Sequence, residues 1–272
     1  MTELIYMFSY QFMLRAFVIG GLVSLCAALL GVTLVLKHYS MIGDGLSHVG
    51  FGALSVAMVM NMAPLVIAVP VVIFAAFFLL RISESTKLKG DAAIGLISSS
   101  AIAIGVTVTS LSGGMNSDVY SYMFGSILSM NERDVILSVG LSIAVLFVFI
   151  FCYHTIFAIT FDEGFAKANG TKTGVYNVLL AILTAVTIVV GMRIMGTMLI
   201  SGLIIFPALS SMRLFQNFKS VIISSAVLSL CCFFAGMVLS YLFALPTGAS
   251  IVLANLFVFL CMACLGKCLG VE

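Results

Sequence analysis

Charged residues are scarce in this sequence: Asp, Glu, Lys and Arg make up only 8% of its 272 residues. A water-soluble domain usually carries about 25% charged residues, so this chain has too little charge to cover a water-facing surface. Hydrophobic residues make up 62% of the chain, and the excess must face lipid. The shortage of charge therefore excludes a soluble enzyme and predicts a multi-pass membrane protein.

Several chemical signatures are also missing. The net charge is only +2 and the basic residues occur singly, so no basic stripe predicts nucleic-acid binding. The sequence has neither the G-x-x-x-x-G-K-[ST] motif that binds nucleotide phosphates nor the H-E-x-x-H motif expected of an intramembrane metalloprotease. The seven cysteines are dispersed in apolar stretches and do not form a disulfide framework. We therefore expect no enzyme activity in this chain, and any ATPase that drives it would be a separate chain.

Long apolar runs, separated by charged or Gly- and Pro-containing stretches, predict the membrane crossings. Each crossing needs about 20 apolar residues. The predicted spans are 12–36, 44–60, 64–80, 92–111, 135–153, 174–192, 194–212, 220–243 and 248–265. The apolar segment 119–130 is too short to cross and is predicted to be re-entrant or to lie on the surface. We expect an all-α polytopic membrane protein with about eight to nine transmembrane helices, in one transmembrane domain over residues 1–272.

The positions of Lys and Arg predict the orientation of the chain. Arg15, Arg133 and Arg193 fall on one side of the predicted membrane, and the remaining basic residues fall on the other. Cytoplasmic loops carry an excess of Lys and Arg, so the second side is predicted to be cytoplasmic. The N-terminus is then outside, the C-terminus is inside, and the polar stretch of about 160–173 is a cytoplasmic loop.

Asp44 and His48 form the most informative polar pair, because apolar residues follow them as far as Met60. Side chains four residues apart project from one face of a helix. Ionisable groups within a membrane are costly and usually face a cavity or a partner. A carboxylate and an imidazole suit Zn²⁺ or Mn²⁺, and two copies of the pair across a two-fold axis would supply four ligands. Ser47 would then orient the ligands by hydrogen bonding.

The same residues admit a second interpretation, in which the pair has no role in metal binding. Asp44 would cap the N-terminus of a helix, and His48 would make a hydrogen bond within the protein core. The pair by itself does not separate these two interpretations.

The segment from Phe161 to Gly170 predicts a short cytoplasmic surface helix. Asp162 and Glu163 favour a helix start, and Gly170 favours a helix end. Phe161, Phe165 and Ala168 would share an apolar face that fits a groove in a partner protein. The alternative is a helix that lies at the membrane interface.

Taken together, these motifs resemble the permease subunit of the zinc/manganese-type ABC importers. Residues 43–48 are similar to the family pattern G-D-A-[IL]-[SA]-H, and residues 161–170 are similar to F-D-P-E-F-A-K-A-x-G. Further matches at 123–128 and 196–208 extend the resemblance over about residues 12–265. Two departures are that Gly45 replaces the usual alanine and that no proline follows Asp162.

The resemblance implies a fold like that of the type II ABC importer permeases. It implies a homodimer that moves a divalent metal ion into the cytoplasm past Asp44 and His48. The ion would be zinc or manganese, with iron as a further candidate. The ion would be the transported substrate, with no permanently bound cofactor. Two copies of a cytoplasmic ATPase would dock on the surface helix. The residues implied in this coupling are Phe161, Asp162, Glu163, Phe165, Ala166 and Gly170.

The resemblance also implies an extracellular solute-binding protein that delivers the ion, and a location in the plasma or inner membrane of a prokaryote. Two rival transporter classes stay open: a permease for a metal chelate such as a siderophore or cobalamin, and a proton-coupled secondary metal carrier. Secondary carriers place several acidic and His residues in different spans, whereas the intramembrane acids here are nearly limited to Asp44. Asp44 and His48 are side chains that bind a bare metal ion, and this favours an ion permease over a chelate permease.

Overall fold

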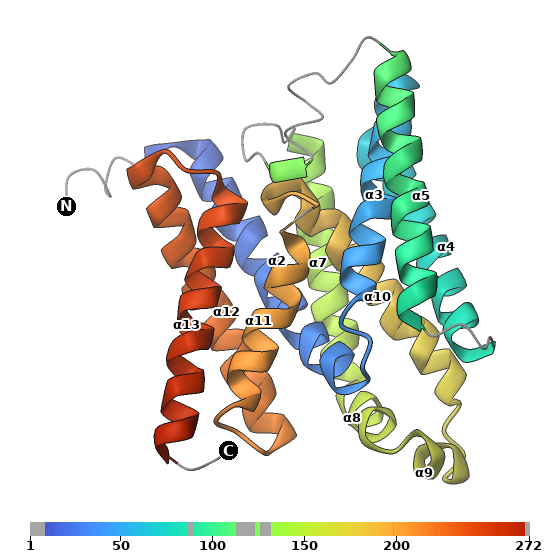
Figure 1. Ribbon diagram of the computed structural model, residues 1–272, viewed down its shortest axis with the longest axis vertical. Helices are drawn as coiled ribbons and strands as arrows, with labels where there is room; N and C mark the ends of the chain where they lie inside the picture. The colour runs from blue at the N-terminus through green and yellow to red at the C-terminus, as the bar shows by residue number, and fades with distance from the viewer. Residues whose placement is uncertain (1–8, 86–89, 113–122, 126–131, 198, 270–272) are drawn as a thin grey trace.

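The computed structural model describes residues 9–85, 90–112, 123–125, 132–197 and 199–269, with the backbone alone for residues 80–85 and 90–91. Within these ranges every long element is a helix, and the helices form an elongated bundle (Figure 1). The helices are α2 (Gln11–Leu36), α3 (Ile42–Val59), α4 (Pro64–Ser85), α5 (Gly90–Leu111), α7 (Glu132–Phe151), α8 (Tyr153–Phe161), α9 (Glu163–Ala168), α10 (Thr173–Met195), α11 (Ile200–Met212), α12 (Phe218–Phe243) and α13 (Thr247–Leu269).

The helix count confirms the predicted number of crossings. In the described part of the chain, 7 helices are long and apolar enough to span a bilayer, and the apolar helices Pro64–Leu79 and Ile200–Met212 are shorter. Each predicted span corresponds to one of these helices. The prediction for segment 119–130 falls almost wholly outside the described residues, which include only 123–125 of it.

Two boundaries differ from the prediction. The chain break predicted at residue 193 lies further on, because α10 continues to Met195 and α11 begins only at Ile200. Gly196 ends α10 with φ +87°, a conformation that L-residues with a side chain rarely adopt. The span predicted to end at residue 153 ends at Phe151, and the residues that follow form the separate helix α8, which extends into the start of the polar loop predicted at about 160–173.

The helices fall into an inner and an outer set. In the apolar 18-residue stretches of α2, α3 and α10, 72%, 72% and 83% of the residues are buried. The corresponding values for α5, α7 and α13 are 28%, 22% and 22%. Small residues let the inner helices approach closely, as at Gly31, where an added Cβ would collide with the backbone carbonyl of Ile204 in α11. The outer helices leave large apolar faces uncovered within one chain, as a lipid-exposed surface requires.

Charged residues lie at the two ends of the helix bundle, and Arg15 and Arg193 share one end as predicted. Arg15 lies near the start of α2 and Arg193 lies in the last turn of α10, and both form ion pairs with the first turn of α7. The short helices α8 and α9 lie at the opposite end of the bundle, together with the end of α13 (Figure 1). This second end is the one that the Lys and Arg distribution predicts to be cytoplasmic.

Two glycines allow close backbone contact between segments that are far apart in the sequence. Gly125 and Gly196 have φ +83° and +87°. A Cβ added to either one would overlap the backbone around the other. The short segment 123–125 therefore crosses directly over the break between α10 and α11, and any larger residue at these two positions would force the crossing apart.

Candidate functional site

Asp44 and His48 face one another on the first turns of α3. His48 Nε2 lies 3.5 Å from Asp44 Oδ2, and their side chains are 16% and 35% exposed, respectively. The residue at the N-cap position is Met41, and no side chain caps this helix. The capping interpretation of Asp44 is therefore not what the structure shows: its carboxylate is directed along the helix face toward the imidazole. Its negative charge in the first turn also complements the helix dipole.

Within residues 42–50 of α3, Asp44 and His48 are the partly exposed residues, and the others are buried. Gly45 packs against α5, and Gly50 packs against α10 and α4. At about 100° per residue, Asp44 and His48 lie more than about 100° around the helix from Gly50 and on the flank of the α5 contact at Gly45. The residues around them in this turn, including Leu46, are buried. Two partly exposed ionisable side chains thus emerge from a buried helix, as expected of groups that line a pathway.

Ser47 is fully buried, and its hydroxyl donates to the backbone carbonyl of Asp44 over 2.7 Å. This bond stabilises the turn that presents Asp44, and the predicted role of Ser47 in orienting metal ligands stays a prediction. Among the described residues, no group of three or more His, Cys, Asp and Glu side chains gathers to hold a metal. Because a structural zinc site has four ligands, the pair would need ligands from water, from backbone carbonyls or from another copy of the chain.

The predicted surface helix is present as α9. Asp162 caps its start, since Asp162 Oδ1 accepts a hydrogen bond of 2.8 Å from the backbone N–H of Phe165. Gly170, with φ +84°, follows the end of the helix as predicted. Both signals were readable from the sequence because capping is decided within a few residues of the chain.

The side chains of this segment point in different directions. Phe165 is 64% exposed and is directed to solvent, whereas Ala166 is only 2% exposed and faces the protein. Phe161 is 58% exposed but also contacts the rings of Phe157 and Phe218. Phe165 is therefore the side chain that is most available to a partner. Docking at these residues stays a prediction.

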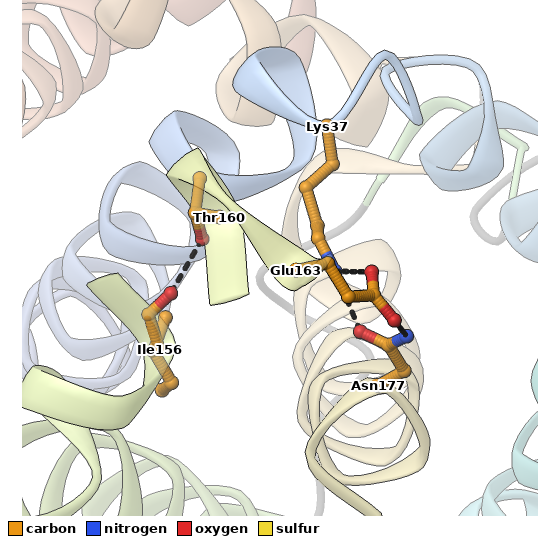
Figure 2. Close-up of polar contacts among 5 residues, drawn as sticks. All are labelled: Lys37, Ile156, Thr160, Glu163 and Asn177. Atoms are coloured by element: carbon orange, nitrogen blue, oxygen red, sulfur yellow. Dashed lines mark hydrogen bonds and ion pairs between the residues drawn. The ribbon is translucent and has the colours of Figure 1, made fainter. Parts of the chain in front are cut away.

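The sequence reasoning missed a polar cluster that joins α9 to two long helices. Lys37 Nζ donates to Asn177 Oδ1 over 2.6 Å and lies 3.2 Å from Glu163 Oε2. Asn177 Nδ2 donates to Glu163 Oε1 over 2.9 Å, which closes the ring of contacts in Figure 2. Figure 2 also shows the neighbouring bond within α8, from Thr160 Oγ1 to the carbonyl of Ile156. An asparagine near the start of an apolar helix was the one signal that pointed to this cluster.

Two ion pairs at the other end of the bundle were also missed. Arg193 Nη2 lies 2.7 Å from Asp134 Oδ2, with side chains 3% and 15% exposed. Arg15 Nη2 lies 2.7 Å from Glu132 Oε1, with side chains 39% and 77% exposed. The first pair joins α7 to α10, and the second joins α7 to α2. They fix the start of α7 on the inner helices.

Comparison with known proteins identifies the family. The profile of the ABC 3 transport family matches residues 9–266. The manganese import system permease protein ScaB of Streptococcus gordonii is 28% identical over 251 residues, which cover 92% of this chain and 90% of that protein. The high-affinity zinc uptake system membrane protein ZnuB of Haemophilus influenzae is 26% identical over 251 residues, which cover 92% and 96% of the two proteins.

The fold gives the same result. The solved structure of PsaBC from Streptococcus pneumoniae in complex with Fab superposes with a TM-score of 0.86 and 26% sequence identity, over 96% of this chain and 94% of that one. The match therefore includes the helices that carry Asp44, His48 and the short helix α9. Since family profile, relatives and fold agree over nearly the whole length, the chain belongs to the ABC 3 transport family.

Proposed function

We propose that this chain is the transmembrane permease subunit of an ATP-binding-cassette importer that moves a divalent metal ion into the cytoplasm. The observation that carries the proposal is the Asp44–His48 pair, partly exposed on an otherwise buried helix turn. Its ligand types suit zinc or manganese, with iron as a further candidate. The named relatives, a manganese import permease and a zinc uptake membrane protein, support the same substrate class. The ion is the transported substrate, and no permanently bound cofactor is needed.

The proposed assembly contains two copies of this chain, each a single transmembrane domain, around a central pathway. Two Asp44–His48 pairs across the two-fold axis would supply the four ligands that one chain lacks. Two copies of a cytoplasmic ATPase would bind near α9, and an extracellular solute-binding protein would deliver the ion. This chain then catalyses no bond chemistry. It alternates between outward and inward access as the ATPases close and open.

The ion must leave as readily as it enters, so a transient site is required. A carboxylate and an imidazole that are partly exposed and not locked by further protein ligands meet this requirement. A carboxylate–imidazole pair can release an ion more easily than a closed cage of four protein ligands, because water can replace one ligand at a time.

The decisive experiment is metal uptake into vesicles that hold this chain with its ATPase and binding protein. Radioactive Zn²⁺, Mn²⁺ and Fe²⁺ are supplied in turn, with and without ATP. We expect uptake of one ion that requires ATP and is indifferent to a proton gradient. Uptake driven by a proton gradient without ATP would favour the secondary carrier. Transport of a siderophore or cobalamin, but of no bare ion, would favour the chelate permease.

The exposed ring of Phe165 provides a separate prediction about the ATPase contact. Phe165→Ala is expected to raise the Kd for the ATPase at least about tenfold, because aromatic anchors at the centre of an interface contribute 1.4 kcal/mol or more. The measurement is a fluorescence titration of ATPase onto the permease in lipid nanodiscs. Phe243→Ala is the matched control, since Phe243 is 66% exposed and ends α12 at the opposite end of the bundle. Equal Kd values for both variants would remove α9 from the docking surface.

A further inference from the structure

The short helix α9 has few attachments to the rest of the protein. It is six residues long, and so short a helix is marginal in water without support from its surroundings. Its cap, the bond between Asp162 and Phe165, lies within the segment itself. Of its side chains only Ala166 is buried. The polar contacts of Glu163 are therefore the main non-covalent link between α9 and the long helices.

The Lys37–Glu163–Asn177 triad is suited to act as a stiff link. Each of the three side chains contacts both of the others, at distances of 3.2, 2.6 and 2.9 Å. The Lys37 side chain is only 9% exposed, and Asn177 is 6% exposed. Salt and water therefore screen this ion pair less than an ordinary surface pair. Glu163 is 45% exposed, but its two buried partners hold its carboxylate by charge-assisted bonds in one geometry, whereas a fully exposed pair samples many.

Each partner of Glu163 belongs to a segment that is connected to α3, the helix of the Asp44–His48 pair. Lys37 ends α2, and backbone bonds from Tyr39 to Leu34 and from Ile42 to Tyr39 fix the turn that leads into α3. α3 then carries Asp44 in its first turn.

Asn177 lies in α10, which packs against α3. An added Cβ on Gly50 of α3 would collide with Met192 of α10. Two series of contacts therefore connect α9 with α3, one through the turn that leads into α3 and one through the face of α3 that packs on α10.

We propose that Lys37 and Asn177 are positioning residues, which clamp α9 to α2 and α10 through Glu163 and convert ATPase movement into movement of α3. The inference rests on the proposed coupling role of α9. With the three contacts of the triad intact, α9 would move as one body with α2 and α10. Without it, α9 would move with the ATPase while α3 stays behind, and ATP would be hydrolysed without transport.

The most informative variant is Lys37→Met. Methionine keeps the length and the apolar stem of lysine, and the charge left behind on Glu163 is 45% exposed and can be hydrated. Glu163→Gln is the second variant, which keeps the side-chain size and one hydrogen bond to Asn177 but leaves Lys37 without its carboxylate. The control is Lys219→Met at the start of α12, because Lys219 is exposed and has no ion pair among the described contacts.

Two readouts test the clamp. In the full chain in nanodiscs without partners, Lys37→Met is expected to speed hydrogen exchange of the α9 amides at least about tenfold, with α8 unchanged. In the complete complex, it is expected to keep ATPase binding and to lower metal uptake per ATP hydrolysed at least about tenfold. Glu163→Gln should shift both readouts in the same direction, and Lys219→Met should shift neither.

A merely structural role would reduce assembly, hydrolysis and uptake together, and this result would overturn the proposal. So would an unchanged uptake-to-ATP ratio in Lys37→Met. If the wild-type complex shows no ATP-dependent uptake of any metal, the proposed function fails and the transmission role falls with it. The exchange measurement then reports separately whether the triad holds α9, since it needs neither metal nor ATPase.

Discussion

Asp44→Asn and His48→Gln are each expected to reduce ATP-dependent metal uptake at least about 100-fold, because even groups that only support metal ligands contribute 10–100-fold. The two side chains lie 3.5 Å apart on one turn of α3 and are the partly exposed members of a buried surface. Each substitution nearly preserves side-chain size and removes the charge or the imidazole nitrogen that an ion would bind. The loss should therefore come from the pathway and not from packing.

The measurement is the same vesicle assay, with the amount of assembled complex determined for each variant. Ser55→Ala is the matched control, since Ser55 lies on the same face of α3 and its hydroxyl only bonds the carbonyl of Phe51. Its uptake should stay within about twofold of the wild type. Full uptake in both Asp44→Asn and His48→Gln would separate the pair from the pathway. The permease assignment would then depend on the wild-type uptake experiment alone.

Local sequence patterns were sufficient for the crossings, the surface helix and the pair on α3. Lipid imposes an apolar run on every crossing, so the spans could be recognised without knowledge of their neighbours. The helix α9 could be predicted because Asp162 and Gly170 set its ends within a few residues. Asp44 and His48 share a helix turn, so their spacing alone placed them together.

The features that the sequence did not reveal all depend on contacts between distant segments. Lys37 lies 126 residues before Glu163 and 140 before Asn177, and no local pattern connects them. Lys37 could be recognised only as one of several lysines on the predicted cytoplasmic side. The same holds for Arg193 and Asp134, which are 59 residues apart. The end of α10 was misplaced because the charged Arg193 interrupts the apolar run, whereas its ion pair with Asp134 lets it lie within the helix.

The second large effect is expected at the Arg193–Asp134 pair. Arg193→Met should destabilise the protein by about 3–5 kcal/mol, because removing one partner of a buried ion pair leaves the other charge uncompensated. The Asp134 side chain is only 15% exposed and cannot be fully hydrated in place. The start of α7 would then detach from α10. Thermal unfolding in detergent and the yield of folded protein after purification measure this loss.

The chain supplies its own control. Arg15 and Glu132 are also 2.7 Å apart and also attach the first turn of α7, but their side chains are 39% and 77% exposed. Arg15→Met should therefore change stability by no more than about 1 kcal/mol. Replacing both buried partners, Arg193→Met with Asp134→Leu, should restore most of the stability, because an apolar pair of similar volume can replace a buried ion pair at little cost. Equal losses in Arg193→Met and Arg15→Met, or no recovery in the double variant, would show that burial is not what distinguishes the two pairs.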